Sequence, residues 1–302
     1  MGGSSTLRQA LRRITQLLTE AGIENAHREA EILLCSIVRC SLLEIYTHPE
    51  LTLLEEESIQ LEQLLRERTV NRVPLQYLVG WVEFCRLPLR ITPVAFIPRP
   101  ETEFFVERLI ASIRTCDWLP RRILDIGTGT GCIALAFASA FPDSEVIGWD
   151  RDDGALSLAE KNAQSLGLQN VSFEQVDIME FSQQCTPFSL IVCNPPYIPL
   201  ADVATLPREV LHEPLHALTD GADGLTFYRF LREHLSSLLD DGGIVALECN
   251  DWQATVVAGL FENFHTHVAS DQYGVERFVL VVSDPSHPVL RKFSLEEQPT
   301  TP

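Results

Sequence analysis

The sequence lacks several features that mark membrane-spanning, secreted or metal-binding proteins. No apolar run approaches the roughly 18 residues that a membrane span requires, and charged residues interrupt the N-terminal stretch before a secretory signal could form. The eight cysteines form no C-x-x-C pair and have no histidine at ligand spacing, which argues against a zinc site and a disulfide framework. We therefore expect a cytoplasmic protein with no membrane contact and no metal.

Clusters of basic residues are also absent. The chain has 23 Lys and Arg against 42 Asp and Glu, which gives a formal net charge of −19, and its basic residues gather no further than pairs such as Arg12-Arg13. A protein that grips phosphate backbones usually carries a basic patch, so we expect no stable nucleic-acid binding. Apolar residues make up 45% of the 302 positions, enough for two hydrophobic cores, and a monomer is expected.

The chain divides into four segments with different patterns. Residues 1–72 carry apolar residues at helical spacing and two S/T-x-x-E capping boxes, at 41–44 and 52–55, which predict a small helical bundle. Beyond it we predict a linker with a β-hairpin at 73–100, a larger domain at 101–285 and a loose tail at 286–302.

Strand-like and helix-like runs alternate through the larger domain. This alternation predicts an α/β fold with a mostly parallel sheet covered on both faces. The last two strand-like runs, near 264–269 and at 276–282, have no helix between them, so we expect an antiparallel edge. The other strands are predicted at 122–126, 145–149, 171–173, 188–192 and 243–248.

A glycine-rich loop, Asp125-Ile-Gly-Thr-Gly-Thr-Gly131, separates the first of these strands from its helix. Glycines allow the backbone to turn tightly and approach a ligand, and the following helix offers free N–H groups. The loop alone leaves two ligands open: residues 129–134 fit the dinucleotide fingerprint G-x-G-x-x-A, and D-x-G-x-G-x-G at 125–131 resembles the first motif of S-adenosylmethionine-dependent methyltransferases. Asp150, which ends the second strand, could hold a ribose hydroxyl in either case, whereas Asp125 would repel a diphosphate and suits a methionine ammonium.

The sequence Asn194-Pro-Pro-Tyr197 follows the fourth strand, at the same sheet edge as the glycine loop. Each proline restricts the residue before it to extended conformations, so the carbonyls of Asn194 and Pro195 are fixed in direction. With the Asn194 side-chain oxygen they offer converging acceptors that suit a planar NH2 group, and Tyr197 can wall the pocket. Such acceptors would orient a weakly nucleophilic amide or amine toward a methyl sulfonium.

An NPPY motif of this kind resembles the amino-methyltransferases, which act on exocyclic NH2 groups of nucleic acids or on glutamine amides of proteins. The order of a helical domain, a hairpin, PRPETE at 98–103, DIGTGTG, NPPY and EPLHAL at 213–218 resembles the release factor glutamine methyltransferases over residues 5–285. This resemblance implies a Rossmann-like class I methyltransferase with a seven-stranded sheet. An adenine-type nucleic-acid methyltransferase is the alternative, which the acidic charge disfavours.

The resemblance also implies a reaction and its residues. Family members use S-adenosylmethionine, yielding S-adenosylhomocysteine, to methylate N5 of the glutamine in the Gly-Gly-Gln motif of bacterial class 1 peptide chain release factors. The helical domain would dock the release factor. The residues that would hold the cofactor are Asp125, Gly127, Thr128, Gly129, Thr130, Gly131, Asp150, Asp177, Ile178 and Asn194; those that would hold or orient the glutamine are Asn194, Pro195, Pro196, Tyr197, Phe96, Arg99 and Glu101.

One stretch departs from the family pattern. After the fifth strand we expect a sequence such as LE-I-G, but this chain has Leu247-Glu-Cys-Asn-Asp251. We interpret the change as a local variation in a loop away from the chemistry.

Overall fold

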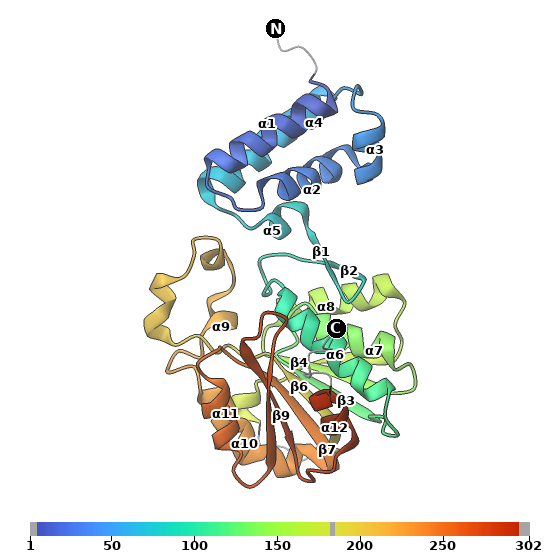
Figure 1. Ribbon diagram of the computed structural model, residues 1–302, viewed down its shortest axis with the longest axis vertical. Coiled ribbons are helices and arrows are strands. Elements are labelled where there is room, and N and C mark those ends of the chain that lie inside the picture. Colours follow the sequence, from blue (N-terminus) through green and yellow to red (C-terminus); the bar gives the residue numbers. More distant parts are fainter. Residues whose placement is uncertain (1–4, 182–184, 296–302) are drawn as a thin grey trace. The chain divides into compact units, whose positions relative to one another are not determined.

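The computed structural model describes residues 5–181 and 185–295 (Figure 1). Its contacts divide the chain into two compact units. The first runs up to Trp81 and includes Pro207–His212, and the second comprises Val82–Leu206 and the chain from Glu213 onward. The boundaries that we predicted at residues 72 and 100 remain predictions. Within the described ranges, no helix is long and apolar enough to cross a membrane.

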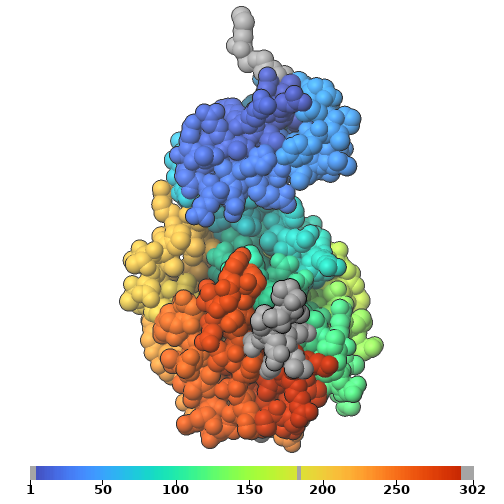
Figure 2. Space-filling model, in the orientation of Figure 1, coloured from blue at the N-terminus to red at the C-terminus, as the bar shows by residue number. Residues whose placement is uncertain are grey.

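The first unit is a helical bundle, as the apolar spacing predicted. Its core includes Ile14, Leu18, Leu33 and Leu34, all fully buried, and the blue to cyan atoms of the space-filling view form the surface over it (Figure 2). Its helices are α1 (Leu7–Glu20), α2 (Ala26–Val38), α3 (Leu42–Thr47), α4 (Glu55–Arg66), the π-helical turn η1 (Glu67–Asn71) and α5 (Leu75–Val79).

Of the two predicted capping boxes, one is confirmed and one is wrong. Ser41 caps α3 together with Glu44. The expected box from Thr52 does not form: Leu54 is the N-cap of α4, and its N–H donates to the Glu57 carboxylate at 2.8 Å. Thr52 instead forms an antiparallel bridge with Thr6, so the backbone is extended where the box would require a helix to begin.

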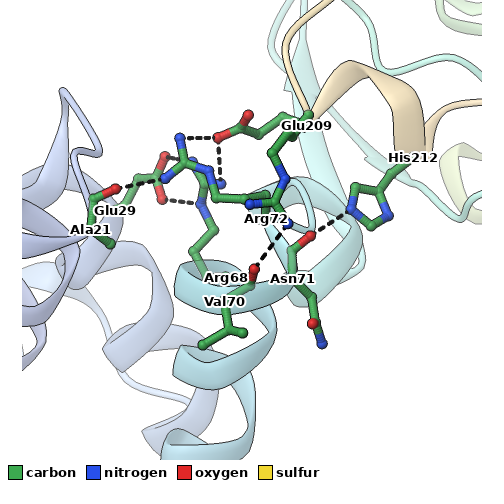
Figure 3. Close-up of polar contacts among 9 residues, drawn as sticks. Ala21, Glu29, Arg68, Val70, Asn71, Arg72, Glu209 and His212 are labelled. Atoms are coloured by element: carbon green, nitrogen blue, oxygen red, sulfur yellow. Dashed lines mark hydrogen bonds and ion pairs between the residues drawn. The ribbon is translucent and has the colours of Figure 1, made fainter.

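A cluster of charges joins Pro207–His212 to the helices within the first unit (Figure 3). The Arg68 guanidinium, only 6% exposed, donates to both oxygens of Glu29 at 2.7 and 2.9 Å. It also donates to Glu209 at 3.3 Å, and Arg72 pairs with the same carboxylate at 2.5 Å. Bidentate, charge-assisted bonds of this kind are among the stronger polar contacts in proteins, so they fix the segment firmly.

The predicted hairpin forms where the second unit begins, with Trp81 as the last residue of the first unit; its strands are β1 (Trp81–Phe84) and β2 (Leu87–Arg90). The main sheet of the second unit has seven strands in the order β5-β4-β3-β6-β7-β9-β8. The first five pair in parallel, and β9 pairs antiparallel with β7 and β8, which confirms the predicted fold and its antiparallel edge. The strands are β3 (Arg122–Ile126), β4 (Glu145–Asp150), β5 (Val171–Gln175), β6 (Phe188–Cys193), β7 (Leu239–Glu248), β8 (His265–Ser270) and β9 (Glu276–Val282).

Helices cover both faces of this sheet (Figure 1). One core contains side chains of α6, α7 and α12, and the other contains side chains of α10 and α11. The helical elements are α6 (Pro100–Arg114), α7 (Cys132–Ala140), α8 (Asp153–Leu166), η2 (Ile178–Glu180), η3 (Leu200–Thr205), η4 (Val210–His212, in the first unit), α9 (Leu215–Leu218), α10 (Thr226–Leu238), α11 (Ala254–Leu260) and α12 (Pro288–Leu295).

The expectation of a loose tail from residue 286 is wrong for α12. Val289 and Phe293 are fully buried. The Phe293 ring packs edge-on against Phe105 of α6 at 6.0 Å, and the Arg108 guanidinium lies 4.0 Å from its centre. These two apolar side chains pack the helix against the domain. The sequence analysis missed this contact because the residues around them are mostly polar. Residues 296–302 lie outside the described ranges.

Candidate functional site

The glycine loop lies at the carboxyl ends of the central strands, between β3 and α7. Gly127, Gly129 and Gly131 all have positive φ, at 73°, 53° and 81°, a region that L side chains rarely enter. The N–H groups of Gly127 and Thr128 both donate to the Trp149 carbonyl of β4, at 2.8 and 2.9 Å. These two bonds fix the start of the loop to the neighbouring strand. The glycines allow its backbone to approach a ligand closely.

Asp125 lies behind this loop and supports it. One of its oxygens accepts the Thr128 hydroxyl at 2.6 Å and the Ala134 N–H at 3.1 Å, which ties the loop to the first turn of α7. The side chain is 1% exposed, and burial raises its pKa to about 7. Since Asp125 is not among the described residues that line the cavity, its direct contact with a methionine ammonium remains a prediction.

A cavity of about 300 Å³ opens in front of the loop. Asp150, at the end of β4, lines it and accepts the Gly129 N–H at 2.9 Å, which leaves carboxylate lone pairs for a further donor. The predicted site residues that line the cavity are Phe96, Gly127, Thr128, Gly129, Thr130, Asp150, Asp177, Ile178, Asn194, Pro195, Pro196 and Tyr197. The structure thus brings twelve of the predicted residues together, and Asp125, Arg99, Glu101 and Gly131 lie outside the lining.

Asn194 directly follows β6 and is held by the first turn of α6. Its Nδ2 donates to the hydroxyl of Thr102 at 3.1 Å, and Thr102 is 2% exposed. Among the described residues no donor bonds Asn194 Oδ1, so this oxygen is left as an acceptor. Asn194 and Pro195 both line the cavity.

The other end of the motif is fixed by residues that the sequence reasoning did not assign to the site. The Tyr197 carbonyl accepts from Gln253 Nε2 at 3.0 Å. Gly224 packs so closely that a Cβ there would lie 2.2 Å from the same carbonyl oxygen. Burial raises the pKa of the Tyr197 hydroxyl, so the ring remains neutral.

The segment that precedes α6 is tied to the segment that follows NPPY. Arg99 forms an ion pair with the buried Glu213, whose second oxygen accepts the Ile97 N–H at 3.0 Å. The Arg99 guanidinium also lies 4.4 Å from the centre of the Phe96 ring. Arg99 therefore acts on the cavity through Phe96, which lines it. Glu213 is the first residue of the EPLHAL motif. This motif is the feature of the sequence that could have identified Glu213 as a residue near the cavity.

The loop with the unusual sequence is linked to the NPPY motif, so our interpretation of it as remote was wrong. Cys249 is fully buried, and the Asn250 N–H donates to Gln253 Oε1 at 3.0 Å, which orients the amide that holds Tyr197. Glu248, just before it, is 2% exposed, and burial raises its pKa to about 7. No spacing in the sequence links Thr102 to Asn194, which it bonds.

The sheet order and the loop at its switch point define a class I methyltransferase fold. Residues 121–277 match the model of a methyltransferase domain. Among solved structures, the catalytic domain of hMettl16 in complex with a MAT2A 3'UTR hairpin has a TM-score of 0.51 over 79% of this chain and 86% of that one. At 14% identity this similarity shows the fold alone.

Residues 9–80 match the PrmC N-terminal domain. The release factor glutamine methyltransferase of Geobacter sulfurreducens is 37% identical over 278 residues, 91% of this chain and 95% of that protein. The one from Escherichia coli is 38% identical over 256 residues, 83% of this chain and 90% of that protein. The chain belongs to the release factor glutamine methyltransferase family, as the motifs had indicated.

Proposed function

We propose that this enzyme methylates the side-chain nitrogen N5 of the glutamine in the Gly-Gly-Gln motif of bacterial class 1 release factors. The observation that carries the proposal is that Asn194 and Pro195 of the NPPY motif line the cavity, with the Asn194 NH2 bonded to Thr102, in a chain of this family. An amide nitrogen is a poor nucleophile because its lone pair is delocalised. Acceptors on both of its hydrogens can orient it and stabilise positive charge that develops there.

We propose S-adenosylmethionine as the methyl donor, because the residues present fit it. Glycines with positive φ let the backbone approach a ligand, and Asp150 lines the cavity with lone pairs to spare for ribose hydroxyls. Asp177 and Ile178 line the same cavity and would receive the adenine. When bound, this cofactor supplies an electrophilic methyl group. The chain's own residues bind it, orient the amide and exclude water.

The remaining parts of the proposal concern the setting of the reaction. We propose that the helical domain, residues 1–72, docks the release factor, and that the enzyme acts as a cytoplasmic monomer without stable nucleic-acid binding. The net charge of −19 supports the last point. Exposed apolar side chains of the helical unit, including Leu43, Leu54 and Ile59, at 63–71% exposure, are the first positions at which to test docking.

The test is a transfer assay with labelled S-adenosylmethionine that offers a class 1 release factor and, separately, unmethylated DNA and RNA. We expect label in the release factor, located at the Gly-Gly-Gln glutamine by peptide mass mapping. A release factor whose motif glutamine is replaced by alanine serves as the control and should stay unlabelled. Label in nucleic acid and none in the release factor would overturn the assignment of the substrate.

A further inference from the structure

The NPPY motif is a stiff segment whose two ends are held by different parts of the fold. Its two prolines restrict the backbone over residues 194–196, so a rotation at either end is passed on to the Pro195 carbonyl between them. Thr102 holds the first residue, Asn194, through a bond of 3.1 Å. The direction of the Pro195 carbonyl therefore depends also on what holds Tyr197, at the other end.

The peptide group that follows Tyr197 is bonded on both sides. Its carbonyl oxygen accepts from Gln253 Nε2 at 3.0 Å, and its N–H, which belongs to Ile198, donates to the Leu218 carbonyl at 3.0 Å. A peptide group is planar and rigid, so the two bonds together fix the direction in which the chain leaves the motif. Of these two bonds, only the one to the Tyr197 carbonyl comes from a side chain.

The side-chain amide of Gln253 joins three segments of the chain. Its Nε2 donates to the Tyr197 carbonyl and, at 3.2 Å, to the Gly224 carbonyl. Its Oε1 accepts the Asn250 N–H at 3.0 Å. A carbonyl only accepts, so the NH2 end of the amide faces the two carbonyls and the oxygen faces the N–H. Glutamine therefore matches this place with both of its polar groups.

The surroundings of this amide are tight and rigid. Gln253 is fully buried, where an amide costs stability unless it is hydrogen-bonded. Gly224 has a φ of 79°, and a Cβ there would lie 2.2 Å from the Tyr197 oxygen and 2.8 Å from Gln253 Nε2. The Asp220 carboxylate accepts backbone N–H groups from residues 222–226 at 2.9–3.0 Å and so braces the loop that carries Gly224. Gln253 thus fastens the Tyr197 carbonyl to a fixed support.

We propose that Gln253 is a positioning residue, which sets the direction of the Pro195 carbonyl and of the Tyr197 ring by holding the peptide group after Tyr197. This inference rests on the proposed function, because it assigns the motif to the orientation of the glutamine NH2. Gln253 is not among the described residues that line the cavity, so it acts through the motif. A misplacement of about 1 Å at a reacting group can lower a rate by about 10²-fold.

The experiment compares Gln253→Met with a matched control, Asn170→Leu. Methionine has nearly the length of glutamine but neither donates nor accepts as an amide does. Asn170 is also an amide that gathers backbone carbonyls, since its Nδ2 donates to those of Ala138, Phe141 and Ser144 at 3.1 Å. It directly precedes β5 and so lies at the amino edge of the sheet, opposite the cavity. Both variants should lower the midpoint of thermal unfolding.

Only one of the two variants should impair the reaction. At a temperature where both are folded, we expect Gln253→Met to lower kcat roughly tenfold to hundredfold. The Kd for S-adenosylhomocysteine should stay within about twofold of wild type, and KM for the release factor should change much less than kcat. Asn170→Leu should keep kcat within about twofold. Wild-type kcat in Gln253→Met, or an equal loss of kcat in Asn170→Leu, would overturn the inference.

Gln253→Glu is the second variant, and it decides the matter if Gln253→Met does not fold, because it preserves the shape of the side chain. An ionised carboxylate cannot donate, and a protonated one has a single proton for the carbonyls of Tyr197 and Gly224. In either form the Tyr197 carbonyl is held less well. We expect a several-fold loss of kcat with unchanged cofactor binding. Wild-type kcat in this variant would overturn the need for the Gln253 NH2.

A readout without catalysis separates this inference from the proposed function. The chain has five tyrosines, and 3-fluorotyrosine gives each a ¹⁹F NMR signal, of which that of Tyr197 is assigned by its loss in Tyr197→Phe. We expect this signal to shift or broaden in Gln253→Met and to keep its position in Asn170→Leu. An unchanged Tyr197 signal in Gln253→Met would sink the inference. A shifted signal, together with no release factor methylation by wild type, would count against the substrate alone.

Discussion

Two glutamates of this protein, Glu209 and Glu248, show what surroundings do to the same side chain. Burial acts to raise the pKa of both. At Glu209 this effect is outweighed by a backbone hydrogen bond and by Arg68 and Arg72, and the pKa falls below its usual value. At Glu248 burial is the dominant effect, and the pKa rises to about 7.

The difference is between a carboxylate that forms ion pairs with two arginines and a buried carboxyl for which no ion pair forms within the described part of the chain. The Arg68 cluster pairs its charges, and its result is a segment fixed to the helical unit. Among the described residues, Oε2 of Glu248 has no hydrogen-bond partner, so burial of this carboxyl lowers stability.

The largest effect is expected from removing the cation of the paired cluster. Arg68→Ala would leave Glu29 with no bidentate partner in a poorly solvated place, and loss of one partner of a buried pair costs about 3–5 kcal/mol. Chemical denaturation should show this as a lower midpoint of unfolding. A loss below about 1 kcal/mol, the range of exposed pairs, would show that the cluster is not an anchor.

Asn194→Ala should have the next largest effect, and on catalysis alone. It removes an acceptor from the nucleophile, for which a loss of about 10²–10³-fold in kcat is expected by analogy with other polar groups that stabilise developing charge. Binding of S-adenosylhomocysteine, measured by calorimetry, should remain, and the unfolding midpoint should change little. Unchanged turnover would refute the role of Asn194.

The dependence of stability on pH should differ in sign between the two glutamates. Glu248 has a raised pKa in the folded state, so the folded protein holds that proton more tightly, and stability falls as pH rises from about 4.5 to about 7. Glu209 has a lowered pKa, so its contribution is present above its unfolded pKa and is lost as pH falls through the folded value. The slope for either is at most about 1.4 kcal/mol per pH unit.

This contrast is measured by comparing wild type with Glu248→Gln and with Glu209→Gln. The free energy of unfolding of wild type relative to Glu248→Gln should decrease when the buffer is changed from about pH 5 to about pH 7. These roughly two pH units lie within the expected titration of Glu248. The free energy of unfolding of wild type relative to Glu209→Gln should decrease only as the pH falls below the usual glutamate pKa. Two parallel curves would contradict the comparison.

The smallest effect is expected at an exposed pair of the same residue types. Arg13 and Glu62 form a bidentate contact within the first unit, but their side chains are 58% and 51% exposed. Arg13→Ala should change the free energy of unfolding by less than about 1 kcal/mol. It is the matched control for Arg68→Ala, and equal losses in both would mean that burial is not what gives the Arg68 cluster its strength.

The fold and much of the site could be predicted because their signals are local. The alternation of apolar runs predicted the parallel sheet, and the lack of a helix before residues 276–282 predicted the antiparallel edge. DIGTGTG and NPPY each follow a strand, so the carboxyl edge of the sheet had to bring them together. The capping box at Thr52 failed because a bridge to Thr6, far away in the sequence, holds the backbone extended.

By itself, the sequence determined the class of fold, the family and twelve of the described residues that line the cavity, because periodicity and motif spacing are properties of neighbouring residues. Only the tertiary structure decided that Asp125 supports the loop from behind and that the Cys249-Asn250-Asp251 loop reaches Tyr197 through Gln253. It also decided that Thr102, in the first turn of α6, bonds Asn194. These contacts join a helix start to the ends of two strands, and residues so far apart in the chain meet only when the sheet and its covering helices pack.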